Sequence, residues 1–193
     1  MALTLDPRSR LRRVLGMVRL GLGPPLLALM AATQAVRVTG PATVALAHPP
    51  PPWQLAIADV LAVSALGALA FWVAAALAGK RGQLSHYVIP VAGAQLPLAG
   101  VALLVGRQVL ATAVAGAAAG KDGEEFLKHP LAMLSPLVPT AVAVLLLTVL
   151  VLGALFVGYR RVSQLEGWRL PVSFAGGLLG AEVVCRLWSW WSG

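Results

Sequence analysis

Long apolar runs with almost no charged residues limit what this sequence can fold into. The most hydrophobic run, residues 130–158, reads PLAMLSPLVPTAVAVLLLTVLVLGALFVG and has no charged side chain. An apolar helix of about 20 residues spans the roughly 30 Å hydrocarbon core of a bilayer. Only 11% of the residues are charged, against about 25% in soluble domains, which is too few to cover a surface that faces water. The sequence therefore predicts an all-α, polytopic membrane protein.

Five apolar segments predict the transmembrane bundle. They form one domain, residues 20–193, preceded by a basic cytoplasmic segment at residues 1–19, and their bounds are about 20–36, 54–78, 86–106, 130–158 and 170–191. Residues 107–120 are too short and too poor in large apolar side chains to span alone, so we expect them to extend the third helix or to lie at the interface. Prolines 90 and 97 predict kinks more than breaks, because neighbouring helices can satisfy the freed carbonyl groups.

The placement of Lys and Arg predicts the orientation of the bundle. With a cytoplasmic N-terminus, ten of these residues lie in inside segments, and four lie outside, namely Arg37, Arg107, Lys121 and Lys128. This excess predicts five spans with the N-terminus inside and the C-terminus outside. The same topology puts tryptophan and tyrosine residues at both headgroup boundaries, with Tyr87, Tyr159 and Trp168 at the inner one. An alternative stays open, in which residues 1–35 are a cleaved signal peptide and four spans remain.

Three ionisable residues, Asp59, Glu182 and Arg186, fall inside the predicted spans. Each costs roughly 2.5–3.5 kcal/mol at mid-helix, so a partner is expected. Asp59 and Arg186 both lie about 7–8 Å below the outer boundary, and Glu182 lies one helical turn deeper than Arg186. We expect Arg186 to bridge Asp59 and Glu182 in an intramembrane polar cluster. The alternatives are that Arg186 reaches the surface without a partner, or that a carboxylate serves a proton or ion path.

Other residues point to helix packing more than to chemistry. Gln95 is expected to hydrogen-bond another helix, and Gly176-x-x-x-Gly180 permits close helix contact. Cys185 is expected to be a small buried side chain. The sequence has no P-loop, HExxH helix or nucleophile elbow, and a solvated loop is the better interpretation of the possible metal ligands Glu124, Glu125 and His129. We therefore expect no catalytic residue, metal, cofactor or nucleic-acid partner.

Two stretches resemble a known family. They are GKRGQLSHYVIPVAGAQLPLAGVALLVG (79–106) and LFVGYRRVSQLEGWRLPVSFAGGLLGAEVV (155–184). Together with the count of five spans, they resemble the Yip1 domain family, in particular its prokaryotic members. Eukaryotic members are linked to vesicle trafficking and small GTPases through a longer N-terminal region with an acidic, aromatic motif, whereas this chain has an arginine-rich start.

The resemblance implies a non-enzymatic protein that organises membranes, acts in a trafficking-like process or binds partners. We expect it in the inner (plasma) membrane of a bacterium, in contact with the lipid bilayer and with a protein partner or further copies of itself. The alternative is a small transporter or proton-coupled membrane subunit that uses Asp59, Glu182 and Arg186.

Overall fold

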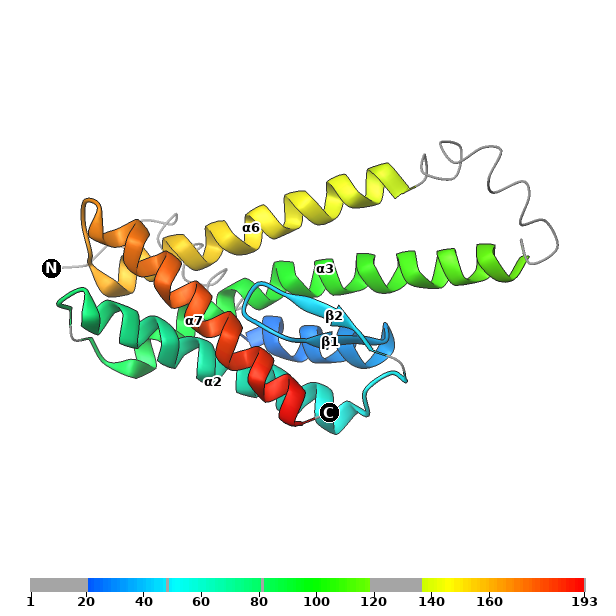
Figure 1. Cartoon of the computed structure of the whole chain (residues 1–193), viewed down its shortest axis with the longest axis horizontal. Helices are drawn as coiled ribbons and strands as arrows, with labels where there is room; N and C mark the ends of the chain where they lie inside the picture. The colour runs from blue at the N-terminus through cyan, green and yellow to red at the C-terminus, as the bar shows by residue number, and fades with distance from the viewer. Residues whose placement is uncertain (1–20, 48, 81, 119–136, 193) are drawn as a thin grey trace, which may run out of the picture.

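Four long helices dominate the computed structural model, which describes residues 21–47, 49–80, 82–118 and 137–192. They are α2 (Trp53–Leu77), α3 (Leu84–Ala118), α6 (Leu137–Ser163) and α7 (Arg169–Trp191) (Figure 1). Each contains a stretch that is long and apolar enough to cross a membrane. The described part of the chain is therefore mainly helical, with four candidate spans, which is consistent with an integral membrane protein.

Helices α2, α3 and α7 each begin within two residues of the start of the corresponding predicted segment. The third helix does not stop at residue 106 but continues to Ala118. Residues 107–118 therefore extend this helix, which was one of the two arrangements that we expected. Pro90 and Pro97 lie inside this helix without ending it. The predicted basic segment at residues 1–19 and the loop that holds Glu124, Glu125 and His129 lie outside the described residues.

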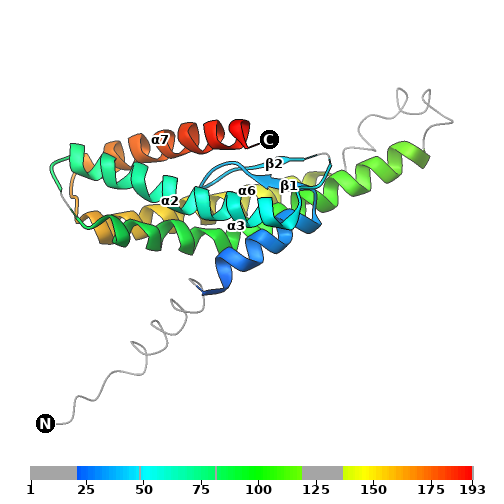
Figure 2. The same cartoon turned by 90° about the horizontal axis from the view of Figure 1, so that it is seen from below.

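The first predicted segment forms a shorter apolar helix, Gly21–Thr33. It runs beside α3, because Gly23 lies against the backbone of Ala92 and Gln34 lies against Gly106. Figure 2 shows it on the side of α3 away from α7. The described helix is shorter than the about 20 residues that cross a bilayer, so the described residues do not establish a fifth crossing.

A β-hairpin, which we did not predict, departs from the purely helical pattern. Strands β1 (Val36–Val38) and β2 (Val44–Leu46) are antiparallel, with Arg37 opposite Ala45. β-Branched valines favour the extended conformation, and the Gly-Pro pair between the strands favours a turn. Val36 and Val38 are buried against the bundle, and the hairpin lies between α7 and α3 (Figures 1 and 2).

The helices form an open arrangement. Helix α2 packs against α7 and α3, α3 packs against α6, and α6 and α7 diverge from their connecting turn (Figure 1). Near that turn, five aromatic rings from all four helices pack with centroids 5.1–6.1 Å apart; they are Phe71, Tyr87, Phe156, Tyr159 and Phe174. Tyr87 and Tyr159 are fully buried there, so their rings pack between the helices instead of facing lipid.

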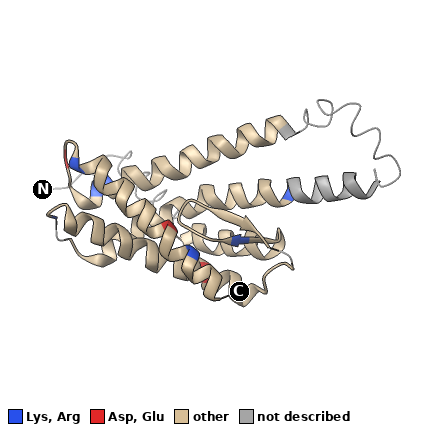
Figure 3. Cartoon of the chain, viewed as in Figure 1, with Lys and Arg blue, Asp and Glu red and all other residues tan. Residues whose placement is uncertain are grey.

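The two ends of the bundle differ in charge. We call the end with the α2–α3 and α6–α7 connections the basic end, because four exposed cations lie there: Lys80, Arg160, Arg161 and Arg169 (Figure 3). We call the opposite end, where β1 and β2 pack, the hairpin end. At the hairpin end the described cations are Arg37, Arg107 and Arg186, and Arg37 is neutralised by an ion pair.

Candidate functional site

Asp59 is the buried charge around which the hairpin end is organised. Its side chain on α2 is fully buried, and Arg37 of β1 donates from Nε to Oδ2 at 2.8 Å and from Nη2 to Oδ1 at 3.2 Å. The indole Nε1 of Trp188 also donates to Oδ1, at 3.1 Å. Both carboxylate oxygens therefore accept hydrogen bonds, and the negative charge faces a guanidinium.

Arg37 also closes the C-terminal end of α7. Its Nη1 donates to the carbonyl oxygen of Ser189 at 2.9 Å, and its Nη2 donates to Oγ of Ser192 at 2.5 Å. The last carbonyls of a helix lack partners within the helix and carry the negative end of its dipole, so a cation stabilises them. We call these residues the Arg37 latch: Arg37, Asp59, Trp188, Ser189 and Ser192. The latch joins β1, α2 and α7.

Glu182 holds the turn of the hairpin. Its Oε2 accepts a hydrogen bond from Oγ1 of Thr43 at 2.6 Å, and its Oε1 accepts one from the backbone N–H of Ala42 at 3.3 Å. Gly40 lies so close that a Cβ atom there would overlap the carboxylate of Glu182. A side chain at position 40 would therefore displace the carboxylate of Glu182, which accepts the hydrogen bonds of the turn.

The predicted bridge from Arg186 to Asp59 and Glu182 is wrong. The described residues contain one ion pair, Arg37–Asp59, and the side chain of Arg186 is exposed. The hairpin brings the donors that serve Asp59 and Glu182. The buried stripe of α7 includes Cys185, whereas the next residue, Arg186, is rotated about 100° around the helix and faces outward.

Sequence reasoning missed Arg37 and Thr43 because both lie in a segment that we treated as a loop. The signal was present in VRVTGPATVAL, residues 36–46, where valines alternate with polar or small residues on either side of a Gly-Pro pair. Such a pattern is typical of a short hairpin. Arg37 is the one cation in this stretch and so a candidate partner for Asp59.

The residues predicted for helix packing have mixed outcomes. Gln95 is fully buried on α3, and its Nε2 donates to Oγ of Ser64 on α2 at 2.7 Å, the contact between helices that we expected. The Gly176–Gly180 prediction is wrong in its register. A Cβ at Gly176 would meet nothing within 4 Å, whereas one at Gly177 would lie 2.7 Å from the ring of Phe71. The close approach of α7 to α2 is therefore at Gly177.

Apart from these contacts, the site holds little that could perform chemistry. Within the described ranges, no three His, Cys, Asp or Glu side chains lie close enough together to hold a metal ion. Cys185 is a buried free thiol. The arrangement is structural: the carboxylates of Asp59 on α2 and Glu182 on α7 hold the hairpin against these two helices. Comparison with known protein families, with curated proteins and with solved structures finds no match to this chain.

Proposed function

We propose that this chain is a non-enzymatic membrane protein of Yip1-like type that organises the membrane or binds a protein partner. The observation that carries the proposal is that Asp59 and Glu182 both hold the hairpin in place. A carboxylate whose two oxygens accept bonds from a guanidinium and an indole holds those groups, and with them the hairpin and the end of α7, in place. The resemblance of residues 79–106 and 155–184 to the Yip1 family supports the same role.

In this proposal the chain crosses the inner membrane of a bacterium five times, with the N-terminus inside and the C-terminus outside. The distribution of charge supports this orientation, since Lys80, Arg160, Arg161 and Arg169 are exposed at the basic end. Cytoplasmic loops carry the excess of Lys and Arg. The hairpin then faces outward, where it offers the exposed residues Ala45 and Leu46 of β2 to a partner.

One observation favours the transporter alternative. Among the described residues Glu182 forms no ion pair, and its recorded donors are the neutral groups of Ala42 and Thr43. Asp, Glu and His side chains inside spans mark proton paths in pumps and transporters. The two functions depend on different groups, because a scaffold requires the intact hairpin whereas a proton path requires the carboxyl group of Glu182.

The test is gentle purification of the tagged protein from its native membrane, with mass spectrometry of the proteins that accompany it. The variant Gly40→Ala places a methyl group where the Glu182 carboxylate lies and so displaces that carboxylate from the turn. Gly93→Ala is its control, because a Cβ at Gly93 meets nothing within 4 Å. We expect a partner, or a second copy of the chain, in stoichiometric amount with the wild type and with Gly93→Ala. We expect recovery of that partner to fall several-fold with Gly40→Ala.

A different outcome of this experiment would contradict the proposal. A protein that purifies alone, and that carries protons into liposomes until Glu182→Gln abolishes the flux, would overturn the scaffold function in favour of transport. Size-exclusion profiles of each variant show whether it remains folded.

A further inference from the structure

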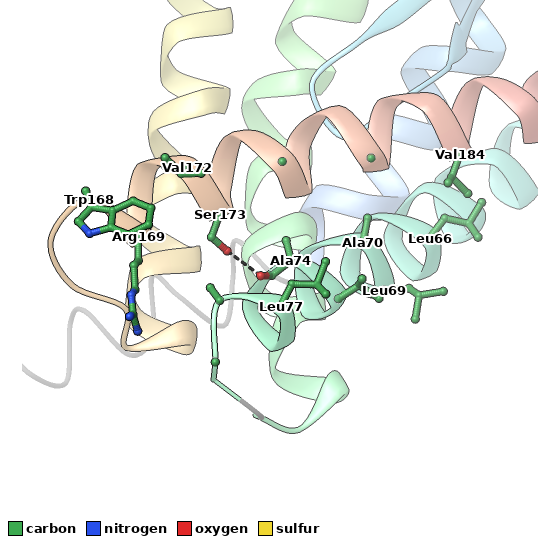
Figure 4. Close-up of a pocket in the computed structure, with 15 residues that line it drawn as sticks. Leu66, Leu69, Ala70, Ala74, Leu77, Trp168, Arg169, Val172, Ser173 and Val184 are labelled. Atoms are coloured by element: carbon green, nitrogen blue, oxygen red, sulfur yellow. Dashed lines mark hydrogen bonds between the residues drawn. The ribbon is translucent and has the colours of Figure 1, made fainter.

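A groove of about 870 Å³ runs between α2 and α7 on the outside of the bundle (Figure 4). It arises because small residues line both helices, with Ala70 and Ala74 on α2 facing Gly176 and Gly180 on α7. The Arg37 latch is not part of it. The groove instead runs from Leu66 and Val184 toward the basic end.

The walls of the groove suit a hydrocarbon chain. Leu69, Val73, Leu77 and Val172 line it and are all more than two-fifths exposed. The hydroxyl of Ser173 is occupied, since it donates to the carbonyl oxygen of Ala74 at 2.9 Å. The lining of α7 from Arg169 to Val184 extends about 22 Å at 1.5 Å per residue, against about 15 Å for one leaflet of a 30 Å core. A whole acyl chain fits along it.

The basic end of the groove is cationic. Arg169 and Trp168 line it there, both are exposed, and Arg169 forms no ion pair with any described residue (Figure 4). A guanidinium matches the geometry of a phosphate with two parallel hydrogen bonds. Tryptophan favours the depth of the headgroups. An apolar slot that ends at an arginine is complementary to a lipid with an anionic headgroup.

A second groove repeats this design. It lies between α3 and α6, has a volume of about 630 Å³, and is lined by glycines 93, 153 and 158. It too ends at an arginine of the basic end, Arg161. The coincidence of an apolar slot with a cation at the same end thus occurs on two separate helix pairs.

We propose that the groove between α2 and α7 binds an anionic glycerophospholipid, with one acyl chain between the helices and the phosphate at Arg169. The proposal is independent of the scaffold function and of which side of the membrane the basic end faces. The competing occupant is a transmembrane helix from a partner or from a second copy of this chain, which the test below separates.

The experiment is native mass spectrometry of the detergent-purified protein with phosphatidylglycerol or phosphatidylcholine added at equal concentration. We expect preferential retention of phosphatidylglycerol. Arg169→Gln should lower that preference about fivefold, since one basic residue near anionic lipid contributes about 1 kcal/mol. Arg186→Gln is the matched control, because it removes the same charge from the other end of the same helix and should leave the preference unchanged.

A second variant tests the slot itself. Gly176→Leu places its Cβ in open space, with nothing within 4 Å, and its longer side chain occupies the groove, so it should remove the binding that depends on Arg169. Gly153→Leu, also in open space but in the other groove, should retain it. Equal binding of the two lipids, or equal losses in Arg169→Gln and Arg186→Gln, would overturn the proposal. A change of oligomeric mass in Gly176→Leu with lipid binding intact would show a protein interface instead.

Discussion

At the scale of single residues, the hairpin end depends on how Asp59 is compensated. A fully buried carboxylate is costly unless it has a charged partner and further hydrogen bonds. Arg37 supplies the charge, Trp188 supplies another donor, and the remaining donors of Arg37 serve the end of α7. Loss of either member of the pair leaves the other inside the protein without compensation.

We therefore expect Asp59→Ala and Arg37→Ala each to lower the free energy of unfolding by about 3–5 kcal/mol. The double variant Asp59→Leu/Arg37→Met should lose less than either single substitution, because it removes both charges and retains apolar volume. Thermal unfolding in detergent, followed by tryptophan fluorescence, measures the difference. Arg186→Ala is the control and should change stability by no more than about 0.5 kcal/mol, as expected for an exposed residue. A double variant that loses the sum of the two single losses would show that the pair is not coupled.

The outcome for these residues shows how far sequence could predict the site. Depth along an apolar segment was enough to identify Asp59 as a charge that needs a cation. The cation itself was missed, because we considered cations inside the spans, whereas Arg37 belongs to a hairpin that folds back between them. Helical periodicity gives no information on how the hairpin folds back onto α2, because this depends on contacts such as that of Arg37 with Asp59, which are 22 positions apart.

At the scale of elements, the packing of α7 on α2 depends on one face of small residues. The buried stripe repeats every fourth residue and consists of Ser173, Gly177, Ala181 and Cys185. Ser173 hydrogen-bonds Tyr159 of α6 and the carbonyl of Ala74 on α2, so the stripe also joins three helices near the basic end. Small residues permit such close approach in membranes, where packing and hydrogen bonds replace the hydrophobic effect as the driving force.

Two adjacent glycines on α7 provide a matched test of this packing. Gly177→Ala places a methyl group 2.7 Å from the ring of Phe71 and 3.2 Å from Cβ of Ala74, whereas Gly176→Ala places one in open space. Both gain the same helix propensity of about 1 kcal/mol. We expect Gly177→Ala to be less stable than Gly176→Ala by about 1–3 kcal/mol, the typical cost of overpacking. Equal melting temperatures would show that α2 and α7 are not in close contact at Gly177.

The elements themselves were largely accessible from sequence, because hydropathy determines which segments can lie in lipid. The register of their contacts was not. In a helix rich in Gly and Ala, the stripe through Gly176 and Gly180 and the stripe through Gly177 and Ala181 are equally plausible faces. Only the position of Phe71 on the neighbouring helix decides between them, and that position follows from the three-dimensional packing.

At the scale of the whole molecule, the two ends of the bundle have different roles. Aromatic rings join all four long helices near the basic end, and the hairpin fills the space where α6 and α7 have diverged. The hairpin is therefore a structural part of the bundle and also its most distinctive exposed element. The orientation of the chain decides on which side of the membrane the hairpin is exposed.

We predict that the hairpin end faces outward, and single cysteines test this. The chain has one native cysteine, which is buried, so Cys185→Ala gives a background for the exposed positions Ala45→Cys in the hairpin and Gln83→Cys at the basic end. A maleimide that cannot cross membranes should label residue 45 in intact spheroplasts and residue 83 only after permeabilisation, since the excess of Lys and Arg remains inside. Ala2→Cys tests the fifth crossing and should behave like residue 83 if residues 20–36 span the membrane. Labelling of residue 83 from outside would reverse the orientation, and labelling of residue 2 together with residue 45 would reduce the spans to four.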